Sequence, residues 1–318
     1  MSITRKLTAA LAFSTALVPA AAFAEDWNVA LVLGERGSGF HQAIACGARA
    51  AAEELEIQID VQASPTYSAT AQVPVLNSVL ATNPAAIVLD PTSSTALIAP
   101  LQDAAATGAI IVAVDTTVDD PSMLSAEVAT DNFQVGVAAA RELAAMLDGQ
   151  TGDVAQINSI PGISTVDARI AGFEAEIANY PNLNYVGNQF AGEDIPKAQQ
   201  AFSSLLSANP NLIGVAAQSN NPAIGIAGGI RANGVADTVA AVAVDADEAQ
   251  IEALREGLLD ALIIQQPWEM GYQGVVQAVN ALNGDEVTTP IGTSTVTATA
   301  DTIDDPEVAK YLYEGNCI

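Results

Sequence analysis

The chain has very few of the residues that carry metal or nucleophilic chemistry. Its 318 residues include one histidine, His41, and two cysteines, Cys46 and Cys317. A structural zinc site needs about four closely spaced Cys or His ligands, so no metal is expected. The nucleophile turn G-x-S-x-G is also absent. A Ser-His-Asp hydrolase is therefore disfavoured, and His41 is expected to line a pocket or to begin a helix.

Phosphate-binding loops are missing as well. Gly34, Gly37 and Gly39 follow the first apolar run, but they do not have the G-x-G-x-x-G spacing, and Glu35 lies in the turn. No P-loop lysine motif occurs elsewhere in the chain. A bound nucleotide or other cofactor is therefore not expected.

Basic residues are scarce. Ten Lys and Arg stand against 37 Asp and Glu, which gives a formal net charge of −27. A surface of this charge repels phosphate backbones and anionic lipid head groups. The composition therefore argues against nucleic-acid and membrane-surface partners. The acidity favours solubility, as in adaptation to a saline habitat, and says little about the fold.

Long hydrophobic runs are absent apart from one near the N-terminus. Arg5 and Lys6 precede an apolar run over residues 7–18, and Ala-Phe-Ala ends the segment at residues 22–24. The run is shorter than the roughly 20 residues that span a bilayer. This arrangement is typical of a secretory signal peptide over residues 1–24, cleaved after Ala24, and an uncleaved anchor is the alternative. No cysteine follows the cleavage site directly, so we expect a protein free in the periplasm of a two-membrane bacterium.

The two cysteines would meet an oxidising compartment after export. An even number of cysteines there favours a disulfide. Cys317 is the penultimate residue, so a bridge to Cys46 would hold a C-terminus that otherwise frays. Two unpaired cysteines are the alternative.

The rest of the chain alternates short apolar runs with helix-like segments. Runs such as NVALVL and AIIVAV are apolar on both faces, as are strands of a parallel sheet that helices cover on both sides. The pattern restarts near Gln134, and no Gly-, Ser- or Pro-rich linker separates the halves. We therefore predict two doubly wound, Rossmann-like α/β domains joined by ordered crossovers. The expected strands cover residues 28–33, 59–63, 86–89, 109–114, 153–157, 184–188, 212–217, 239–244 and 261–264. The expected helices cover residues 42–55, 72–80, 98–106, 134–147, 167–178, 197–207, 222–233, 248–256 and 272–282, and Asp247 and Gln250 form a capping box.

Polar side chains recur directly after the predicted strands. Asp90, Asp115, Asp245 and Gln265 each follow an apolar run, at the strand ends where open parallel sheets bind ligands. Helix capping is the alternative for a single carboxylate, above all for Asp90. Several such groups from two domains would line a cleft with hydrogen-bond acceptors, which suits the adjacent hydroxyls of a sugar or polyol.

In their order and spacing, the motifs resemble the periplasmic solute-binding proteins of ABC transporters, in the ribose-binding (sugar-binding type I) family. Phe40 contributes, and the other segments are LDPTSS (89–94), VAVDTT (112–117), ATDN (129–132), PGISTVDARIAGF (161–173), VAVDAD (242–247) and IIQQPWEMGY (263–272). The resemblance implies a ligand cleft between two lobes and a three-strand hinge, with crossovers at 130–132, near 265–266 and near 290–293. The lobes would comprise residues 25–130 plus 266–291, and residues 131–265 plus 292–318.

The resemblance also implies a set of ligand-facing residues. Carried over by position, they are Ser38, Phe40, His41, Asp115, Thr116, Ser219, Asn220, Asp245 and Gln265, with Asp90 as a weaker member. Asp167 stands where the family has a sugar-binding arginine, and Glu193 stands where an aromatic often stacks on the sugar. Arg169 matches a second arginine that is usually structural. We therefore expect a pocket rich in carboxylates, better suited to a neutral polyol, another sugar or an amine-bearing ligand than to ribose.

The function implied is that of a monomeric receptor without enzymatic activity. It would capture a small polyhydroxylated solute, close by a hinge motion and deliver the solute to an ABC permease in the membrane. A sensor of the same fold, signalling to a membrane kinase or chemoreceptor, is one alternative, and a secreted enzyme is another. The Cys46 and Cys317 pair also resembles a disulfide found in one branch of the family.

Overall fold

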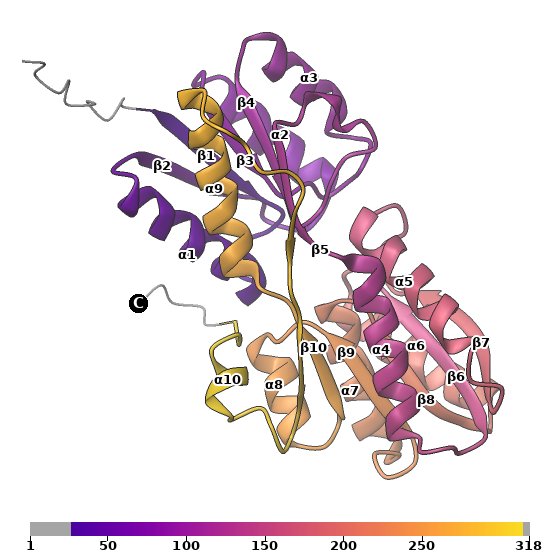
Figure 1. Ribbon diagram of the computed structural model, residues 1–318. Helices are drawn as coiled ribbons and strands as arrows, with labels where there is room; N and C mark the ends of the chain where they lie inside the picture. Colours follow the sequence, from indigo (N-terminus) through magenta and orange to yellow (C-terminus); the bar gives the residue numbers. More distant parts are fainter. Residues whose placement is uncertain (1–26, 314–318) are drawn as a thin grey trace, which may run out of the picture.

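Each half of the molecule is built on its own six-stranded sheet, and three chain segments join the halves (Figure 1). This computed structural model describes residues 27–313. The predicted signal peptide and Cys317 lie outside the described residues. None of the helices in the described part has both the length and the apolar character needed to cross a bilayer. The predicted fold class, two parallel-sheet α/β domains, is confirmed.

The first lobe has the strand order β11-β5-β4-β3-β1-β2, and every pair is parallel. Its strands are β1 (Asn28–Leu33), β2 (Gln58–Ala63), β3 (Ala86–Leu89), β4 (Ile110–Val114), β5 (Ala126–Thr130) and β11 (Ile291–Thr293). Its helices are α1 (Gly39–Glu54), α2 (Ala69–Leu80), α3 (Ile98–Ala106) and α9 (Pro267–Asn283), with a 3-10 turn η1 (Pro121–Met123). We call this the N-lobe.

The second lobe, the C-lobe, has the order β12-β10-β9-β8-β6-β7, in which only β12 is antiparallel to its neighbour. Its strands are β6 (Gly152–Asn158), β7 (Leu183–Phe190), β8 (Leu212–Ala217), β9 (Ala240–Val244), β10 (Ala261–Ile264) and β12 (Val296–Thr299). Its helices are α4 (Asn132–Met146), α5 (Ser164–Ile177), α6 (Ile195–Ala208), α7 (Asn220–Asn233), α8 (Glu248–Arg255) and α10 (Pro306–Ala309).

Alternate side chains of the central strands are buried on opposite faces of each sheet. In β1, Val29 and Leu31 share a core with Ile44 of α1, whereas Ala30 and Val32 share one with Leu76 of α2. Because helices cover both faces, both sets of side chains are apolar, as the sequence pattern predicted. Layers of this kind leave the carboxyl ends of the strands free to line a site.

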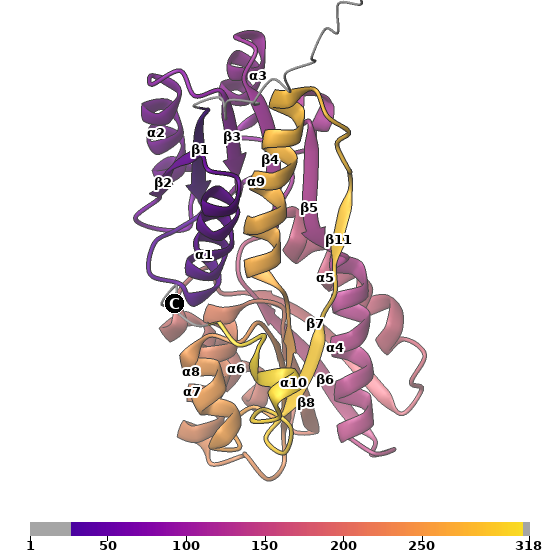
Figure 2. The same cartoon turned by 60° about the vertical axis from the view of Figure 1, so that its left-hand side comes forward.

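In the N-lobe, α1 and α9 touch backbone to backbone. A Cβ atom added to Gly47 would lie 1.8 Å from the carbonyl oxygen of Trp268, and one added to Gly271 would lie 1.9 Å from that of Ile44. Only glycine allows two helices to approach so closely. The contact fixes α9, which follows a crossover, against the N-lobe (Figures 1 and 2).

The C-lobe repeats this arrangement with α4 and α5. A Cβ atom on Gly136 would lie 1.9 Å from the carbonyl oxygen of Arg169, and one on Gly172 would lie 2.0 Å from that of Phe133. The contact therefore fixes the position of α5 at the residue whose side chain enters the site described below.

Hydrogen bonds link the three crossovers to one another. Thr130 at the end of β5 donates its hydroxyl to Gln265 Oε1 at 3.0 Å, and its oxygen also lies 3.0 Å from Thr293 Oγ1. Gln266 donates to Ser294 Oγ at 2.5 Å. The three connecting segments are thus side by side and ordered, as the absence of a flexible linker predicted.

Candidate functional site

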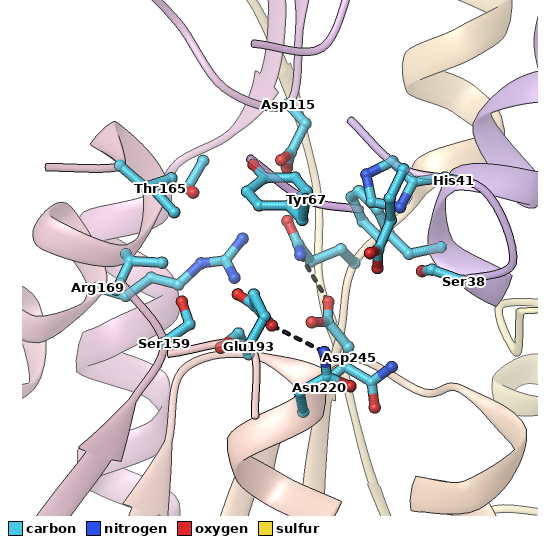
Figure 3. A pocket seen from close by; sticks show the side chains of 17 residues that line it. Ser38, His41, Tyr67, Asp115, Ser159, Thr165, Arg169, Glu193, Asn220 and Asp245 are labelled. Carbon is cyan, nitrogen blue, oxygen red and sulfur yellow. Dashed lines mark hydrogen bonds between the residues drawn. The ribbon is translucent and has the colours of Figure 1, made fainter. Parts of the chain in front are cut away.

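A pocket lies between the lobes, at the carboxyl ends of both sets of strands (Figure 3). Its N-lobe lining is Glu35, Ser38, Phe40, His41, Tyr67 and Asp115. Its C-lobe lining is Ser159, Ile163, Thr165, Val166, Arg169, Glu193, Ser219, Asn220, Asn221 and Asp245, and Gln265 comes from the second crossover. Nine of the twelve residues expected at the site line this pocket, and Asp90, Thr116 and Asp167 do not.

The lobes touch on two sides of the pocket. On one side, Asp247 Oδ1 accepts a hydrogen bond of 3.0 Å from the backbone N–H of Phe40, at the start of α1. Asp247 also forms the predicted capping box with Gln250 at the start of α8. Burial, together with the charge of Asp245, raises the pKa of Asp247 to about 6. On the other side, the N–H of Thr117 donates to Ser164 Oγ at 3.1 Å.

Two aspartates mark equivalent positions in the lobes. Asp115 follows β4 and Asp245 follows β9, and their φ angles are 60° and 85°. Non-glycine residues rarely adopt this left-handed conformation, and it costs about 1–3 kcal/mol where the surroundings impose it. The conformation belongs to a turn that brings each carboxylate to the pocket (Figure 3).

The surroundings of Asp115 favour its protonated form. Burial and the charge of Asp90 raise its pKa to about 7, although the charge of Arg169 opposes them. Its Oδ2 accepts from Thr116 Oγ1 at 3.1 Å, while its buried Oδ1 has no hydrogen-bond partner in the described part of the chain. Thr116 is buried outside the pocket, so it supports Asp115 and does not face the pocket itself.

Arg169 enters the pocket from α5, which corrects the expectation that it is only structural. Its Nε donates to Asn132 Oδ1 at 2.7 Å and its Nη1 to the carbonyl of Gln218 at 2.8 Å. The remaining nitrogen, Nη2, is buried and has no partner among the described residues. Two hydrogen bonds therefore fix the guanidinium while one edge stays available inside the pocket (Figure 3).

Asp167 was expected to face the ligand, and the structure places it outside the pocket. It is exposed, and both its carboxylate oxygens accept from the N–H of Gly162, at 3.2 and 3.0 Å. The reason is helical geometry. Residues two positions apart on a helix differ by about 200° in direction, so Asp167 faces away when Arg169 faces the pocket.

Asp90 lies behind the pocket and pairs with His41. The carboxylate is fully buried, its Oδ2 lies 2.8 Å from His41 Nε2, and it also accepts from the N–H of Gly34 at 3.2 Å. Burial alone would lower the pKa of His41, but the hydrogen bond and charge of Asp90, with Glu35 and Asp115, outweigh it and raise that pKa. His41 Nδ1 is buried and has no partner in residues 27–313. Asp90 therefore fixes the orientation of the His41 ring.

Glu193 lines the pocket at the position where the family often has an aromatic. Its Oε2 accepts from Asn221 Nδ2 at 2.9 Å, and burial raises its pKa. The apolar lining comes instead from Phe40, Ile163 and Val166.

Sequence reasoning missed eight lining residues. They are Glu35, Tyr67, Ser159, Ile163, Thr165, Val166, Arg169 and Asn221. Ser159 directly follows β6, so the strand-end rule could have found it. Tyr67, from the loop after β2, packs its ring 5.7 Å from that of His41 and had no comparable pattern in the sequence.

Several buried polar atoms of the pocket have no hydrogen-bond partner within residues 27–313. Asp115 Oδ1 and Asn220 Oδ1 are acceptors, Arg169 Nη2 is a donor, and Ser159 Oγ and Ser219 Oγ can be either. Buried polar atoms without partners are costly unless a ligand or water completes them. A small ligand with several hydroxyls, each both donor and acceptor, would complete this set.

Two parallel-sheet lobes, three crossovers and a pocket between the strand ends define the two-lobed solute-binding class of proteins. The family model for the periplasmic binding protein domain matches residues 29–286. The chain belongs to that family.

Relatives of known function are similar along most of the chain. The D-apiose import binding protein of Actinobacillus succinogenes is 25% identical over 256 residues, which cover 80% of this chain and 82% of that protein. The ribose import binding protein of Salmonella typhimurium is 27% identical over 281 residues, covering 88% and 93% of the two chains.

Solved structures agree with the fold. An ABC transporter solute-binding protein from Agrobacterium vitis, bound with α-D-tagatopyranose, has a TM-score of 0.88 and 34% identity, covering 91% of this chain and 99% of that one. A carbohydrate transporter solute-binding protein from Agrobacterium radiobacter, in complex with D-arabinose, has a TM-score of 0.84 and 27% identity, covering 91% of this chain and 99% of that one.

Proposed function

We propose that this protein is the periplasmic sugar-binding component of an ABC importer. It captures a small sugar or polyol between its lobes, closes by a hinge motion and delivers the solute to a membrane permease. The observation that carries the proposal is the set of buried donors and acceptors that both lobes direct into one pocket and that have no partner among the described residues. Enclosure strengthens each hydrogen bond to a ligand hydroxyl, because water is excluded.

The ligand we propose is a neutral monosaccharide or polyol. Relatives are named for D-apiose and ribose, and similar structures hold tagatose and arabinose. Arg169 supplies a charged donor and His41 a ring nitrogen, while Asp115 and Asn220 supply acceptors. Phe40, with the other apolar lining residues, offers a surface for the C–H face of a sugar ring.

Anions are poor candidates despite the presence of Arg169. Four carboxylates, those of Glu35, Asp115, Glu193 and Asp245, line the same pocket. Even with Asp115 partly protonated, the charge of the other carboxylates would repel a sugar acid or sugar phosphate. We therefore expect no binding of such anions.

Calorimetry on the protein comprising residues 25–318 tests the proposal. D-Tagatose, D-arabinose, D-ribose and D-allose are titrated separately, with D-galacturonate and D-ribose 5-phosphate as anionic comparisons. We expect at least one neutral sugar to bind, and a sugar at 100 times its Kd to add about 2.7 kcal/mol to the free energy of unfolding. Binding of an anion alone, or of none of the neutral sugars, would contradict the proposal.

Export and the disulfide belong to the same proposal. N-terminal sequencing of protein from the periplasmic fraction should begin at Glu25. Cys46 is buried in α1, and its proposed partner Cys317 lies beyond the described residues. Thiol titration of the denatured, unreduced protein should find no free thiol, and two titratable thiols would refute the bridge. Sedimentation should show a monomer, with or without sugar.

A further inference from the structure

The C-terminal tail reaches the pocket from behind. After β12 the chain turns through α10 and returns toward the start of α1 (Figures 1 and 2). Ile303 and Val308 bury the tail against the C-lobe, and Arg255 donates to Asp304 Oδ1 at 2.6 Å. The described part of the tail ends at Tyr313. Tyr313 is therefore held by packing as well as by its own contacts.

Tyr313 is buried and touches both lobes. Its backbone N–H donates to the carbonyl of Ala246 at 3.4 Å, in the C-lobe. Its ring meets the ring of Phe40 from the N-lobe edge to face, with centroids 5.6 Å apart. Phe40 lines the pocket and Tyr313 does not. The tyrosine thus lies directly behind pocket residues of both lobes.

The Tyr313 hydroxyl has two partners that fix its direction. It accepts from the backbone N–H of Gln265 at 3.2 Å and lies 3.1 Å from Asp245 Oδ1. Burial, together with the charge of Asp245, raises the pKa of Tyr313 well above its usual value, so the hydroxyl keeps its proton. That proton is therefore donated to the carboxylate.

Asp245 receives a second hydrogen bond at the same oxygen. Gln265 Nε2 donates to Asp245 Oδ1 at 2.8 Å, an interaction drawn as a dashed line in Figure 3, so Oδ1 is shared by two donors from outside the strand. Oδ2 has no hydrogen bond to any residue in the described part of the chain. Asp245 also adopts a φ of 85°, in which its direction depends on such support. The two donors thus leave one defined oxygen for a ligand.

We propose that Tyr313 is a positioning residue for ligand binding: the tail holds Asp245 in its binding orientation through the tyrosine hydroxyl. The proposal rests on the proposed function, since Asp245 is taken as a sugar contact. It assigns to the C-terminal tail a role in affinity, in addition to any role in stability.

The first test is Tyr313→Phe, which keeps the ring against Phe40 and removes only the hydroxyl. The probe is whichever of D-tagatose, D-arabinose, D-ribose and D-allose binds the unchanged protein in calorimetry. We expect its affinity to fall about tenfold, because a charge-assisted hydrogen bond to Asp245 is lost. Tyr311→Phe is the matched control: it lies in the same tail, beneath the Lys310 ammonium, and does not line the pocket. The affinity of the Tyr311→Phe protein for the same sugar should not change.

A double-variant cycle separates positioning from general loss of structure. If Tyr313 acts through Asp245, then Tyr313→Phe should weaken binding no further in a protein that already carries Asp245→Ala. If the two losses multiply, or if Tyr313→Phe binds as tightly as the unchanged protein, the proposal is wrong.

A measurement without sugar keeps the inference separate from the proposed function. With tyrosine labelled by 13C at Cζ, the exchange rate of the Tyr313 hydroxyl proton can be read by NMR. We expect slow exchange in the unchanged protein and at least about tenfold faster exchange in Asp245→Ala, because the acceptor is lost. Equal rates would overturn the inference whether or not a sugar binds. Failure of every sugar to bind, with slow exchange retained, would refute the proposed function and leave Tyr313 holding Asp245.

Discussion

The two lobes place an aspartate at the same point of the fold and surround it differently. Asp115 follows β4, the third strand from the β11 edge of its sheet. Asp245 follows β9, the third strand from the β12 edge of its sheet. Both aspartates adopt a left-handed conformation. In the described part of the chain, the Asp115 carboxyl group receives one hydrogen bond, from the hydroxyl of its own neighbour Thr116. Asp245 receives two, from the second crossover and from the C-terminal tail.

The difference shows that a buried carboxylate at a strand end needs hydrogen-bond donors from other segments to fix its direction. Burial raises the pKa of Asp115 to about 7, and the nearby charge of Asp90 adds to the effect. Hydrogen bonds to the charged form would offset burial, but the N-lobe supplies Asp115 with few of them. The C-lobe supplies donors to Asp245 through segments far away in sequence. The N-lobe carboxyl therefore has a raised pKa and a single side-chain donor within the described residues, whereas two donors from distant segments fix the direction of the C-lobe carboxyl.

The largest expected effect concerns a feature that the lobes share, the glycine contact between two helices. Gly136→Ala should lower the free energy of unfolding by about 2–3 kcal/mol, because the new methyl group meets the backbone of α5 and forces the helices apart. Gly47→Ala should do the same at the α1–α9 contact in the N-lobe. Urea denaturation measures both losses.

The matched control is Gly228→Ala on α7. There, an added Cβ meets only the far end of the Gln199 side chain, at 3.3 Å. The exchange should be neutral or should stabilise the protein by up to about 1 kcal/mol, since alanine favours a helix over glycine. A loss at Gly228 equal to that at Gly136 would show that the helix contact is not the cause.

The next largest effect is the difference in sugar affinity lost when each of the two aspartates is replaced. Asp245→Ala should weaken sugar binding by about tenfold to a hundredfold, since a hydrogen bond to a charged group is worth about 1.5–3 kcal/mol. Asp115→Ala should cost less at pH 7, where part of Asp115 is already protonated. Calorimetry with the sugar that binds the unchanged protein gives both affinities. Equal losses at pH 7 would remove the distinction between the lobes, and normal binding by Asp245→Ala would exclude it as a contact.

The third effect is on how the free energy of unfolding depends on pH in the absence of a ligand. The pKa of Asp115 is raised from 3.8 to about 7 on folding. The folded protein therefore holds a proton that the unfolded chain has lost, so this contribution to stability is full below about pH 4 and decreases as the pH rises to about 7. Asp115→Asn should remove this decrease. An unchanged slope of the unfolding free energy between pH 4 and 8 would contradict the assignment.

Sequence patterns predicted the features that depend on neighbouring residues in the chain, namely the central strands and the polar residues at their ends. Apolar runs predicted the central strands, and the rule for strand ends placed Asp115, Asp245 and Gln265 at the pocket. The strands β5, β11 and β12 were not predicted as strands. In β5, AEVAT alternates buried and half-buried residues and has no continuous apolar run.

The direction in which a side chain points, and contacts between segments far apart in the sequence, could not be predicted in this way. Aligning the PGISTVDAR segment by position selected Asp167, whereas the turn of α5 selects Arg169. Asp90 follows the strand-end rule, yet it lies behind His41 and supports it. The Tyr313 hydroxyl reaches Asp245 only because the tail folds back across the C-lobe, which no local pattern indicates.

The smallest expected effect tests whether Thr116 orients Asp115 through its hydrogen bond, as Tyr313 is proposed to orient Asp245. Thr116→Val removes the hydroxyl that donates to Asp115 and keeps a branched side chain of similar size. Loss of a hydrogen bond that lowers the pKa of Asp115 should move the pH-dependent decrease in stability above about pH 7. Sugar affinity at pH 7 should fall only about threefold, because Oδ1 of Asp115 stays available to the ligand. A tenfold loss with no movement of the pH midpoint would indicate that Thr116 contacts the sugar directly and would restore it to the binding set.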